Sequence, residues 1–402
     1  MNEHSASRIA PDNAAPPSEL PWHRARAKRS RNIASLRAAA RMRLPRGIFD
    51  FIDGGAEDEL TLEDNVAAFG RRRLMPRVLV DVSRPDLRSK ILGRESQLPF
   101  AIGPTGGAGF VWPRGDLALA GVAAACGIPY TMATTSSVSI EHMRERIDGR
   151  LWLQSYIFRQ RDFTRGMIRR AIDAEYEALV ITVDLPVGGN RERDYRNDFS
   201  VPFRYTPRNV LDFALHPEWA YTTLRHGFPS FANLEGLAPS SDAASAASSI
   251  GRNYDPSFAW EGLAEIRDLW PRKLIVKGVV HVDDAAALAG LGVDAIVVSN
   301  HGGRQLDGAP ATIDALPAVL AAVAGRAEVY LDGGIRRGSD IFKALALGAD
   351  AVLLGRATLY GLAAAGQFGV ERAVAILKEE LTRTMQLCGV TTVDGIDTGF
   401  LT

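Results

Sequence analysis

Short apolar segments rich in β-branched residues recur along the chain, and segments with helix-like spacing of apolar residues lie between them. Residues 115–127 (GDLALAGVAAACG) and 338–348 (GSDIFKALALG) are two such helical segments. Strands that alternate with helices predict a parallel sheet, and eight units favour a closed (β/α)8 TIM barrel over an open sheet. The predicted strands are residues 99–105, 128–134, 151–157, 178–184, 273–279, 295–301, 329–334 and 351–356.

Polar and charged side chains occur where these apolar runs end. In a (β/α)8 barrel the carboxyl ends of the strands converge on one face, and the active site lies there. We therefore expect a single site built from several strand ends. The residues at or beside those ends are Thr105, Gln154, Tyr156, Asp184, Lys277, His301, Asp332 and Arg356.

A long insertion, residues 185–255, separates the fourth predicted strand from a predicted helix at about 256–270. Insertions of this length in a compact domain are usually lids, binding loops or contact surfaces. Two interpretations remain open: a self-packed subdomain, or a patch at 203–252 that contacts a membrane or a protein partner. Its aromatic residues are Phe203, Tyr205, Phe213, Trp219, Tyr221, Phe228 and Phe231.

Charge and composition narrow the class of protein. Lys and Arg together number 47, as do Asp and Glu, so no global field favours nucleic acid or an acidic membrane. Residues 1–32 are rich in proline and end in a basic cluster, which predicts a disordered tail ahead of one barrel domain at 33–402. With only Cys126 and Cys388, the chain has no disulfide framework and fits a reducing compartment.

The N-terminal segment contains no apolar core typical of a secretory signal. Nor does any run approach the roughly 18 apolar residues that a membrane-spanning helix needs. We therefore expect a cytoplasmic protein. Peripheral contact with the inner face of the cell membrane, through residues 203–252, is the alternative.

The sequence SNHGGRQLD at 299–307 carries the strongest chemical signal. His301 lies at a predicted strand end and is followed by Gly302, Gly303 and Arg304. Imidazole exchanges protons near neutral pH, so this position favours a general base over a structural histidine. A base that becomes an imidazolium needs a nearby anion, for which Asp184 is the candidate, although Asp184 could equally cap the segment that follows it.

Three other cationic residues suggest that the ligand is an anion. A guanidinium binds a carboxylate through two hydrogen bonds, so Arg304 and Arg191 at the barrel mouth would suit a substrate carboxylate. Lys277 ends a strongly apolar run (LIVKG) and needs an anionic partner there.

The last two strands are followed by glycine-rich loops, DGGIRRGSD at 332–340 and LGRAT at 354–358. Barrels often bind phosphate with the loops after the seventh and eighth strands and a helix N-terminus. Glycines expose backbone amides, and Arg336 and Arg356 supply positive charge. The two loops together predict a phosphorylated ligand.

These motifs resemble the FMN-dependent family that oxidises 2-hydroxy acids, from about residue 33 to 390. The bacterial mandelate dehydrogenases are the members with the most similar motifs. The shared sequences include FIDGGAEDE, VDVSRPDL, IGPTGGAG, WPRGDLALA, RERDYRN, RDLWPRKLIVKG, SNHGGRQLD, DGGIRRGSD and LGRATLYG.

The resemblance implies a role for each matching residue. His301 matches the catalytic base and Asp184 its partner, while Lys277 matches the lysine beside the flavin N1–C2 edge. The substrate-binding positions are Arg304, Arg191, Tyr156 and Thr135. The FMN-binding positions are Thr105, Gly106, Gln154, Thr182, Lys277, Ser299, Asp332, Gly333, Arg336, Gly355 and Arg356.

Three positions bear on substrate and acceptor. Phe51 replaces a family tyrosine that helps bind carboxylate, which removes a hydrogen bond to a charged group, about 1.5–3 kcal/mol. Thr135 is small where glycolate oxidase has tryptophan, which leaves room for an aryl or long alkyl group. Gly106 is typical of the dehydrogenases of the family, whereas its oxidases tend to carry alanine.

The expected activity is oxidation of an (S)-2-hydroxy acid, with an aryl side chain, to the 2-oxo acid by a homo-oligomeric, FMN-dependent enzyme with a quinone-type acceptor. The alternatives are an oxidase that uses O2 on lactate or another aliphatic 2-hydroxy acid, isomerisation of a phosphorylated isoprenoid, and a non-catalytic flavin-binding scaffold. The isomerase interpretation leaves the histidine and arginines unexplained, and the presence of His301, Asp184, Arg304 and Lys277 argues against the scaffold.

Overall fold

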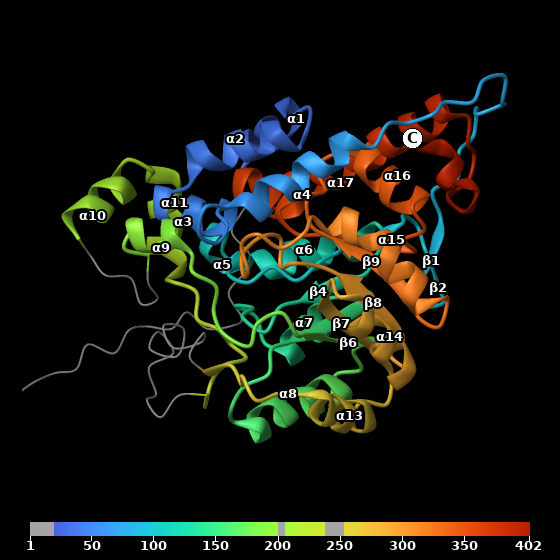
Figure 1. Ribbon diagram of the computed structural model, residues 1–402. Helices are drawn as coiled ribbons and strands as arrows, with labels where there is room; N and C mark the ends of the chain where they lie inside the picture. The colour runs from blue at the N-terminus through green and yellow to red at the C-terminus, as the bar shows by residue number, and fades with distance from the viewer. Residues whose placement is uncertain (1–19, 200–205, 238–252) are drawn as a thin grey trace, which may run out of the picture.

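Eight parallel strands form a closed barrel in the computed structural model, which describes residues 20–199, 206–237 and 253–402 (Figure 1). Each neighbouring pair is parallel, and the last strand closes the barrel against the first. The predicted (β/α)8 barrel is therefore confirmed. The strands are β3 (Phe100–Ile102), β4 (Tyr130–Met132), β5 (Leu151–Ser155), β6 (Ala178–Thr182), β7 (Lys273–Val279), β8 (Ala295–Val298), β9 (Glu328–Asp332) and β10 (Ala351–Leu354).

Helices surround the barrel, as the alternating pattern predicts (Figure 1). α17 is the longest and is kinked at Ala365–Gly366, where the backbone leaves helical geometry. The surrounding helices are α5 (Ala108–Val111), α6 (Gly115–Ala125), α7 (Ile140–Arg146), α8 (Arg161–Asp173), α13 (Trp260–Leu269), α14 (Val282–Leu291), α15 (Thr312–Val323), α16 (Gly338–Ala346) and α17 (Arg356–Cys388), and two short 3-10 helices, η1 (Val393–Gly395) and η2 (Thr398–Phe400), end the chain.

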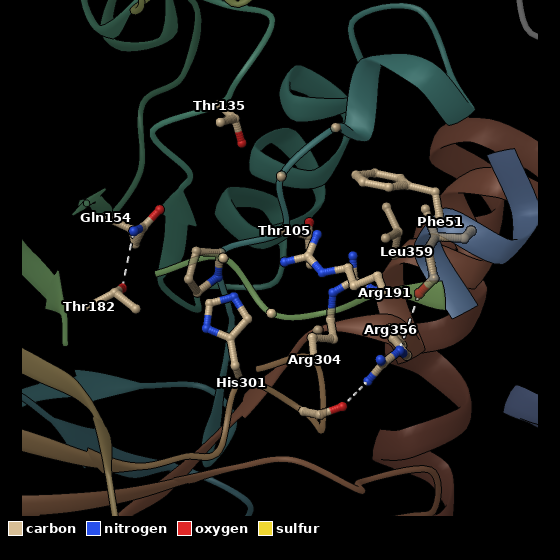
Figure 2. A pocket seen from close by; sticks show the side chains of 18 of the residues that line it. Phe51, Thr105, Thr135, Gln154, Thr182, Arg191, His301, Arg304, Arg356 and Leu359 are labelled. Atoms are coloured by element: carbon tan, nitrogen blue, oxygen red, sulfur yellow. Dashed lines mark hydrogen bonds between the residues drawn. The ribbon is translucent and has the colours of Figure 1, made fainter. Parts of the chain in front are cut away.

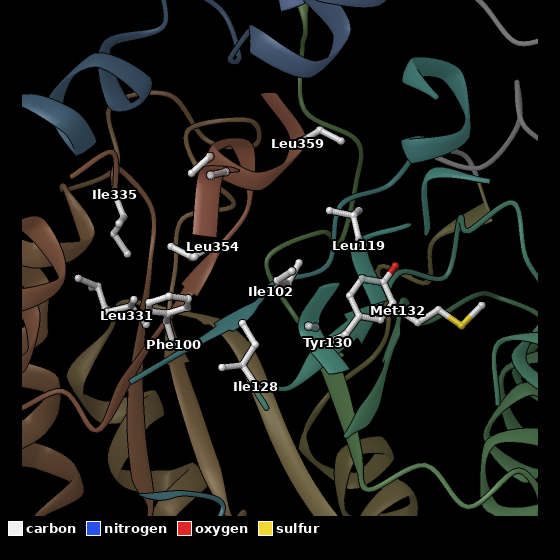
Figure 3. Close-up of a cluster of buried hydrophobic side chains, with 14 of the residues drawn as sticks. Phe100, Ile102, Leu119, Ile128, Tyr130, Met132, Leu331, Ile335, Leu354 and Leu359 are labelled. Atoms are coloured by element: carbon white, nitrogen blue, oxygen red, sulfur yellow. The ribbon is translucent and has the colours of Figure 1, made fainter. Parts of the chain in front are cut away.

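The strands bury side chains on both faces, which explains their nearly continuous apolar runs. One set points into the barrel, including Trp152, Val297 and Tyr330, and the other packs under the helices, as Phe100 and Leu331 do in Figure 3. The hairpin of β1 (Ser89–Ile91) and β2 (Arg94–Ser96) inserts its turn into the inner cluster. This hairpin closes the amino end of the barrel and leaves the carboxyl end for a ligand.

The N-terminal segment corrects the expectation of a tail at residues 1–32. Residues 1–19 lie outside the described part of the chain, but Pro21–Arg29 form helix α1. Arg26 of α1 donates a hydrogen bond to the Ala364 carbonyl of α17 at 2.9 Å. Helices α2 (Ile33–Arg43), α3 (Arg46–Asp53) and α4 (Leu60–Arg71) follow. The prediction of disorder was wrong for α1 because its stabilising partners lie far away in the sequence.

The main partner of α1 comes from the insertion. Described parts of residues 185–255 form α9 (Glu192–Arg196), α10 (Pro207–Ala214) and α11 (Pro217–His226). Glu218 of α11 accepts hydrogen bonds from His23, from Arg26 and from Arg43, whose side chain is only 2% exposed. Trp219 donates its indole N–H to the Phe110 carbonyl at 2.8 Å. The insertion is thus bound to α1, α2 and the barrel.

We predict that Glu218→Gln lowers the free energy of unfolding by roughly 3 kcal/mol, because it leaves the Arg43 guanidinium buried without a carboxylate. Burial already lowers the pKa of Arg43 to about 10, and Glu218 opposes that effect. A urea titration monitored by circular dichroism measures the change. Glu379→Gln is the control: its ion pair with Arg372 is on the surface, so it should change stability by less than about 1 kcal/mol.

Candidate active site

A cavity of about 1080 Å³ opens at the carboxyl end of the barrel (Figure 2). A single small-molecule site usually occupies about 300–1,000 Å³, so this cavity can hold a cofactor together with a substrate. Asp184 and Ser299 lie directly behind its wall. The predicted residues that line it are Thr105, Gly106, Thr135, Gln154, Tyr156, Thr182, Arg191, Lys277, His301, Arg304, Asp332, Gly333, Arg336, Gly355 and Arg356.

His301 and Asp184 form a direct pair. His301 Nδ1 lies 2.9 Å from Asp184 Oδ1. Because a carboxylate only accepts, Nδ1 carries the proton of the neutral ring and Nε2 keeps its lone pair. No residue of the described chain hydrogen-bonds to Nε2. Burial lowers the pKa of His301, although Asp184 opposes this effect, so the neutral form that can accept a proton is favoured.

A glycine makes room for Asp184. Gly278 has φ +107°, and a Cβ atom there would lie 2.6 Å from the Asp184 carboxyl carbon. The second carboxylate oxygen, Oδ2, is buried and has no hydrogen-bond partner among the described residues. Asp184, just after β6, therefore holds its carboxylate against the imidazole, and its second oxygen forms no other described hydrogen bond. Such a carboxylate stabilises a positive charge on the ring.

Arg304, Arg191 and Arg356 bring positive charge to the cavity without an acidic partner (Figure 2). None forms an ion pair with another described residue. Arg304 and Arg356 both donate to the Gly54 carbonyl, at 2.7 and 2.9 Å, at the carboxyl end of α3. Burial, together with Arg191 and Arg356, lowers the pKa of Arg304 well below its usual value. Carbonyl oxygens accept hydrogen bonds from the guanidinium N–H groups but do not neutralise their positive charge. A bound anion would neutralise that charge.

Lys277 belongs to a buried polar network below the cavity. Its Nζ atom donates to Ser299 Oγ at 2.9 Å and pairs with Asp332 Oδ2 at 2.7 Å. Ser299 donates to the same Asp332 oxygen at 2.7 Å. Burial alone would lower the pKa of Lys277, but Asp332 and then Asp184 outweigh it and raise the pKa. Lys277 is therefore a fixed ammonium group, as its position in an apolar strand requires.

The loops after β9 and β10 form the end of the cavity predicted to bind phosphate. Gly333 and Gly334 have φ values of +113° and +79°, and α17 starts at Gly355 without a side-chain cap. Arg336 and Arg356 line the same region. The backbone amide of Arg336 is already taken by Asp340 at 2.9 Å, so the guanidinium groups and the uncapped α17 terminus remain for an anion.

The middle of the cavity carries hydrogen-bonding groups suited to a flat heterocycle. Gln154 donates to Thr182 Oγ1 at 3.1 Å and accepts from the Thr134 amide (Figure 2). At Gly106 a Cβ atom would clash with Thr135 Oγ1. This bare backbone lets a ring approach closely.

The donor set fits FMN: basic groups at one end for its phosphate, polar side chains and bare backbone beside the ring, and an ammonium near the predicted N1–C2 edge. Arg336, Arg356 and the α17 terminus would hold the phosphate. Gln154, Thr182 and Lys277 would face the ring. The separate arginine pair, Arg191 and Arg304, is available to a second anion.

An aromatic wall that no sequence pattern predicted lies beside Arg304. Phe51 stacks on Phe199 with ring centroids 4.7 Å apart, and Phe110 packs edge-on against both. The Phe51 ring also lies 5.4 Å from the Arg304 guanidinium carbon, a cation–π contact in place of a tyrosine hydroxyl. Phe231 of the insertion joins Phe110. These residues have no shared spacing in the sequence, and only the fold places them together.

Tyr254 and Asp194 also reach the cavity. The Tyr254 ring lies 5.1 Å from that of Tyr156, which itself lies 6.4 Å from the His301 ring. Asp194 is largely buried near Arg304 and Arg191, and burial raises its pKa. Asp194 belongs to the RERDYRN motif, so the sequence held a signal for it. For Tyr254, at the end of the long insertion, there was none.

Comparisons with known proteins agree with this geometry. Residues 40–402 match the FMN-dependent dehydrogenase family. The (S)-mandelate dehydrogenase of Pseudomonas putida is 45% identical over 370 residues, covering 92% of this chain and 93% of that protein. The L-lactate oxidase of Nostoc sp. is 42% identical over 374 residues, covering 92% and 97%.

A solved structure gives the same result. The crystal structure of the monotopic membrane protein (S)-mandelate dehydrogenase aligns with a TM-score of 0.89 at 43% identity, and the alignment covers 93% of this chain and 99% of that one. The sequence match, the shared barrel and the cavity agree. The chain therefore belongs to the FMN-dependent dehydrogenase family, and its cofactor is FMN.

Proposed function

We propose that this protein oxidises an (S)-2-hydroxy acid with an aryl side chain to the 2-oxo acid, and that a quinone-type acceptor takes the electrons. One observation carries the proposal. A neutral imidazole paired with a carboxylate and two guanidinium groups without acidic partners face the same cavity. An acid with a hydroxyl group on its α-carbon matches both features, and a relative named (S)-mandelate dehydrogenase supports the aryl side chain.

Arg304 and Arg191 bind the substrate carboxylate. Arg191 Nε is buried without a partner in the described chain, so it can donate to the ligand. The Phe51 ring packs against the Arg304 guanidinium and limits its motion. Two charged contacts orient the α-carbon and its hydroxyl group toward His301, which converts an encounter into a fixed geometry.

His301 takes the proton at Nε2. Asp184 accepts the Nδ1 proton in a hydrogen bond and stabilises the imidazolium that forms. FMN, when bound, accepts the two electrons of the oxidation and the second of the two hydrogens that the alcohol loses, the first having gone to His301 as a proton. Lys277 holds a positive charge at the cavity floor, where it would stabilise an anionic reduced ring.

Aromatic rings and small side chains define the space for the substrate side chain. Phe51, Phe110 and Phe199 form one wall, and Thr135 leaves the space above the proposed ring site open. An aryl group packs well against such a surface. The relative named L-lactate oxidase supports a second candidate reaction, oxidation of an aliphatic 2-hydroxy acid by O2.

Gly106 supports a dehydrogenase over an oxidase. An alanine methyl group at this position would meet the Thr135 hydroxyl. The alanine that the oxidases tend to carry would therefore need Thr135 to move. The backbone at Gly106 stays bare, as in the dehydrogenases of the family.

We predict that Asp184→Asn lowers kcat roughly 100-fold, because the imidazolium loses its compensating charge. The acidic limb of the kcat/KM profile should move to lower pH. Burial already lowers the His301 pKa and Asp184 opposes it, so removing the carboxylate lowers the pKa further and the ring stays neutral in more acidic buffer. Steady-state assays across pH measure both effects. A limb that stays in place would contradict the role of Asp184.

The activity itself is tested by anaerobic mixing with (S)-mandelate, 4-hydroxymandelate and (S)-lactate. The wild-type protein should purify yellow, and the aryl acids should bleach its flavin absorbance faster than lactate does. His301→Ala should remain yellow and bleach at least 100-fold more slowly, since general-base catalysis contributes about 10²–10⁴-fold. Bleaching by any one of the acids rules out the scaffold interpretation, and bleaching by none would contradict the proposed activity. Reoxidation by a quinone analogue and by O2 then identifies the acceptor class.

We also propose that the insertion contacts a membrane surface peripherally. Among its described aromatic residues, Trp219 and Phe231 pack inward, whereas Tyr221 and Phe228 are 65% and 45% exposed. Aliphatic side chains also project outward. Leu211, Leu215 and Leu224 are 62%, 69% and 86% exposed. Within the described ranges, no helix is long and apolar enough to cross a bilayer. The membrane association of the related mandelate dehydrogenase structure supports a surface contact.

Replacing Leu211 and Leu224 together by serine should weaken binding to vesicles of phosphatidylglycerol and phosphatidylcholine at least tenfold. Each leucine contributes roughly 1.5 kcal/mol when its exposed surface enters an apolar phase. A flotation assay measures the bound fraction. Leu387→Ser on α17, where the side chain is equally exposed at 69%, should leave binding unchanged. Equal losses in both variants would contradict a specific surface.

A further inference from the structure

The turn that carries His301 has an unusual backbone. Three consecutive residues, His301, Gly302 and Gly303, have φ values of +56°, +64° and +74°. Glycine adopts this left-handed region without penalty, but a residue with a side chain does so at a cost. Such a conformation persists only where surrounding contacts hold it. The contacts that hold this turn therefore influence where the imidazole and Arg304 point.

Asn300 provides those contacts from inside the turn. Its Oδ1 atom accepts a hydrogen bond from the Gly303 amide at 3.2 Å, and its Nδ2 atom donates to the Pro310 carbonyl at 3.0 Å. The side chain is buried, with 6% exposure. These bonds require one orientation of the amide, with oxygen toward Gly303. The reversed orientation would place an NH2 group against the Gly303 N–H.

Asn65 sets that orientation from outside the barrel. It lies on α4, is 1% exposed, and forms a reciprocal amide pair with Asn300. Asn65 Nδ2 donates to Asn300 Oδ1 at 2.8 Å, and Asn300 Nδ2 donates to Asn65 Oδ1 at 2.9 Å. The Thr312 amide donates to the same Asn65 oxygen at 3.2 Å. Each amide in the pair thus fixes the orientation of the other.

Asn65 also contacts the loop after β9, at the phosphate end of the cavity. A Cβ atom at Gly334 would overlap the Asn65 carbonyl group, and one at Gly333 would lie 3.5 Å from Asn65 Oδ1. The contact at Gly334 is with the backbone carbonyl of Asn65 and the one at Gly333 is with its side chain, so this residue lies between the turn that carries His301 and the loop predicted to bind phosphate. Neighbouring backbone contacts strengthen this docking: the Ala56 amide donates to the Gly303 carbonyl at 2.9 Å.

We propose that Asn65 is a positioning residue for the reaction: through Asn300 it holds the His301–Arg304 turn in its left-handed form and links that turn to the loop after β9. The inference rests on the proposed function, because it concerns how the base and the carboxylate anchor are placed. Asn65 does not touch the substrate. A purely structural role would make Asn65 important for folding and leave substrate binding by the folded enzyme unchanged.

The test compares Asn65→Asp with wild type, both loaded with FMN. Aspartate keeps the shape and the acceptor for Thr312, but it presents a second oxygen to Asn300. Either orientation of the Asn300 amide then leaves one oxygen facing another, so the reciprocal pair is broken and the hold of the Asn300 side chain on the Gly303 amide is weakened. We expect kcat/KM for the best acid in the panel to fall 10- to 100-fold, since displacements of about 1 Å can cost that much. The dissociation constant for phenylacetate, measured from the flavin spectrum, should rise at least fivefold as Arg304 moves.

Asn233→Ala is the matched control. Asn233 is also 1% exposed and also joins two segments, accepting from the Ile140 amide and donating to the Val138 carbonyl, but it is not among the residues that line the cavity. It should lower the thermal midpoint and leave both kcat/KM and phenylacetate binding at wild-type values. If Asn65→Asp does not fold, Asn65→Ser replaces it, because serine also breaks the amide pair but adds no charge.

The inference is overturned if FMN-loaded Asn65 variants lose stability but keep wild-type kcat/KM and phenylacetate affinity. The two proposals fail in different ways. If the wild-type protein oxidises no acid, the proposed function fails, yet phenylacetate binding and FMN affinity still report whether Asn65 positions Arg304 and the loop after β9.

Discussion

Positive charge at the carboxyl end of the barrel is the constraint on which the site depends. None of Arg191, Arg304 and Arg356 forms an ion pair with a described residue, and burial lowers the pKa of Arg304 and Arg356, although Asp194 and Asp53 partly oppose that effect. The carboxyl end of α3 supplies carbonyl groups, and its dipole supplies a partial negative charge, through Ile52 and Gly54. This arrangement keeps the arginines hydrogen-bonded but still attractive to anions. The cavity is therefore most favourable when a phosphate and a carboxylate are bound in it.

The barrel does not build this site alone. Helices α1 and α2 pack along α17 (Figure 1), whereas α3 and α4 reach the carboxyl end of the barrel, where they supply Gly54 to the arginines and Asn65 to the turn after β8. The insertion contributes Phe231 to the aromatic wall, and Tyr254, near its end, packs against Tyr156. Glu218 ties the insertion back to α1 and α2. Segments outside the eight repeats thus cover the site and hold its parts in place.

Much of this could be predicted because the relevant signals are local. Each strand is buried on both faces, so its apolar run is visible in the sequence, and the residue that ends the run has only one face of the barrel to reach. Thr105, Gln154, Lys277 and Asp332 all line the cavity for that reason. Helix α1 was missed because its composition resembles a tail, and the partners of its polar groups, the Glu218 carboxylate and the Ala364 carbonyl, are distant in the sequence.

The sequence by itself determined the barrel and the chemical identity of its strand-end residues, because a repeating pattern of burial and a few reactive side chains suffice for both. Tertiary structure alone decided which residues pack against the predicted site residues and hold them in place. Phe51 and Phe199, Asn65 and Asn300, and Tyr156 and Tyr254 are far apart in the chain, and no periodicity relates them. Their contacts arise when separate segments close over one barrel end, since packing and hydrogen bonding there depend on distance in space.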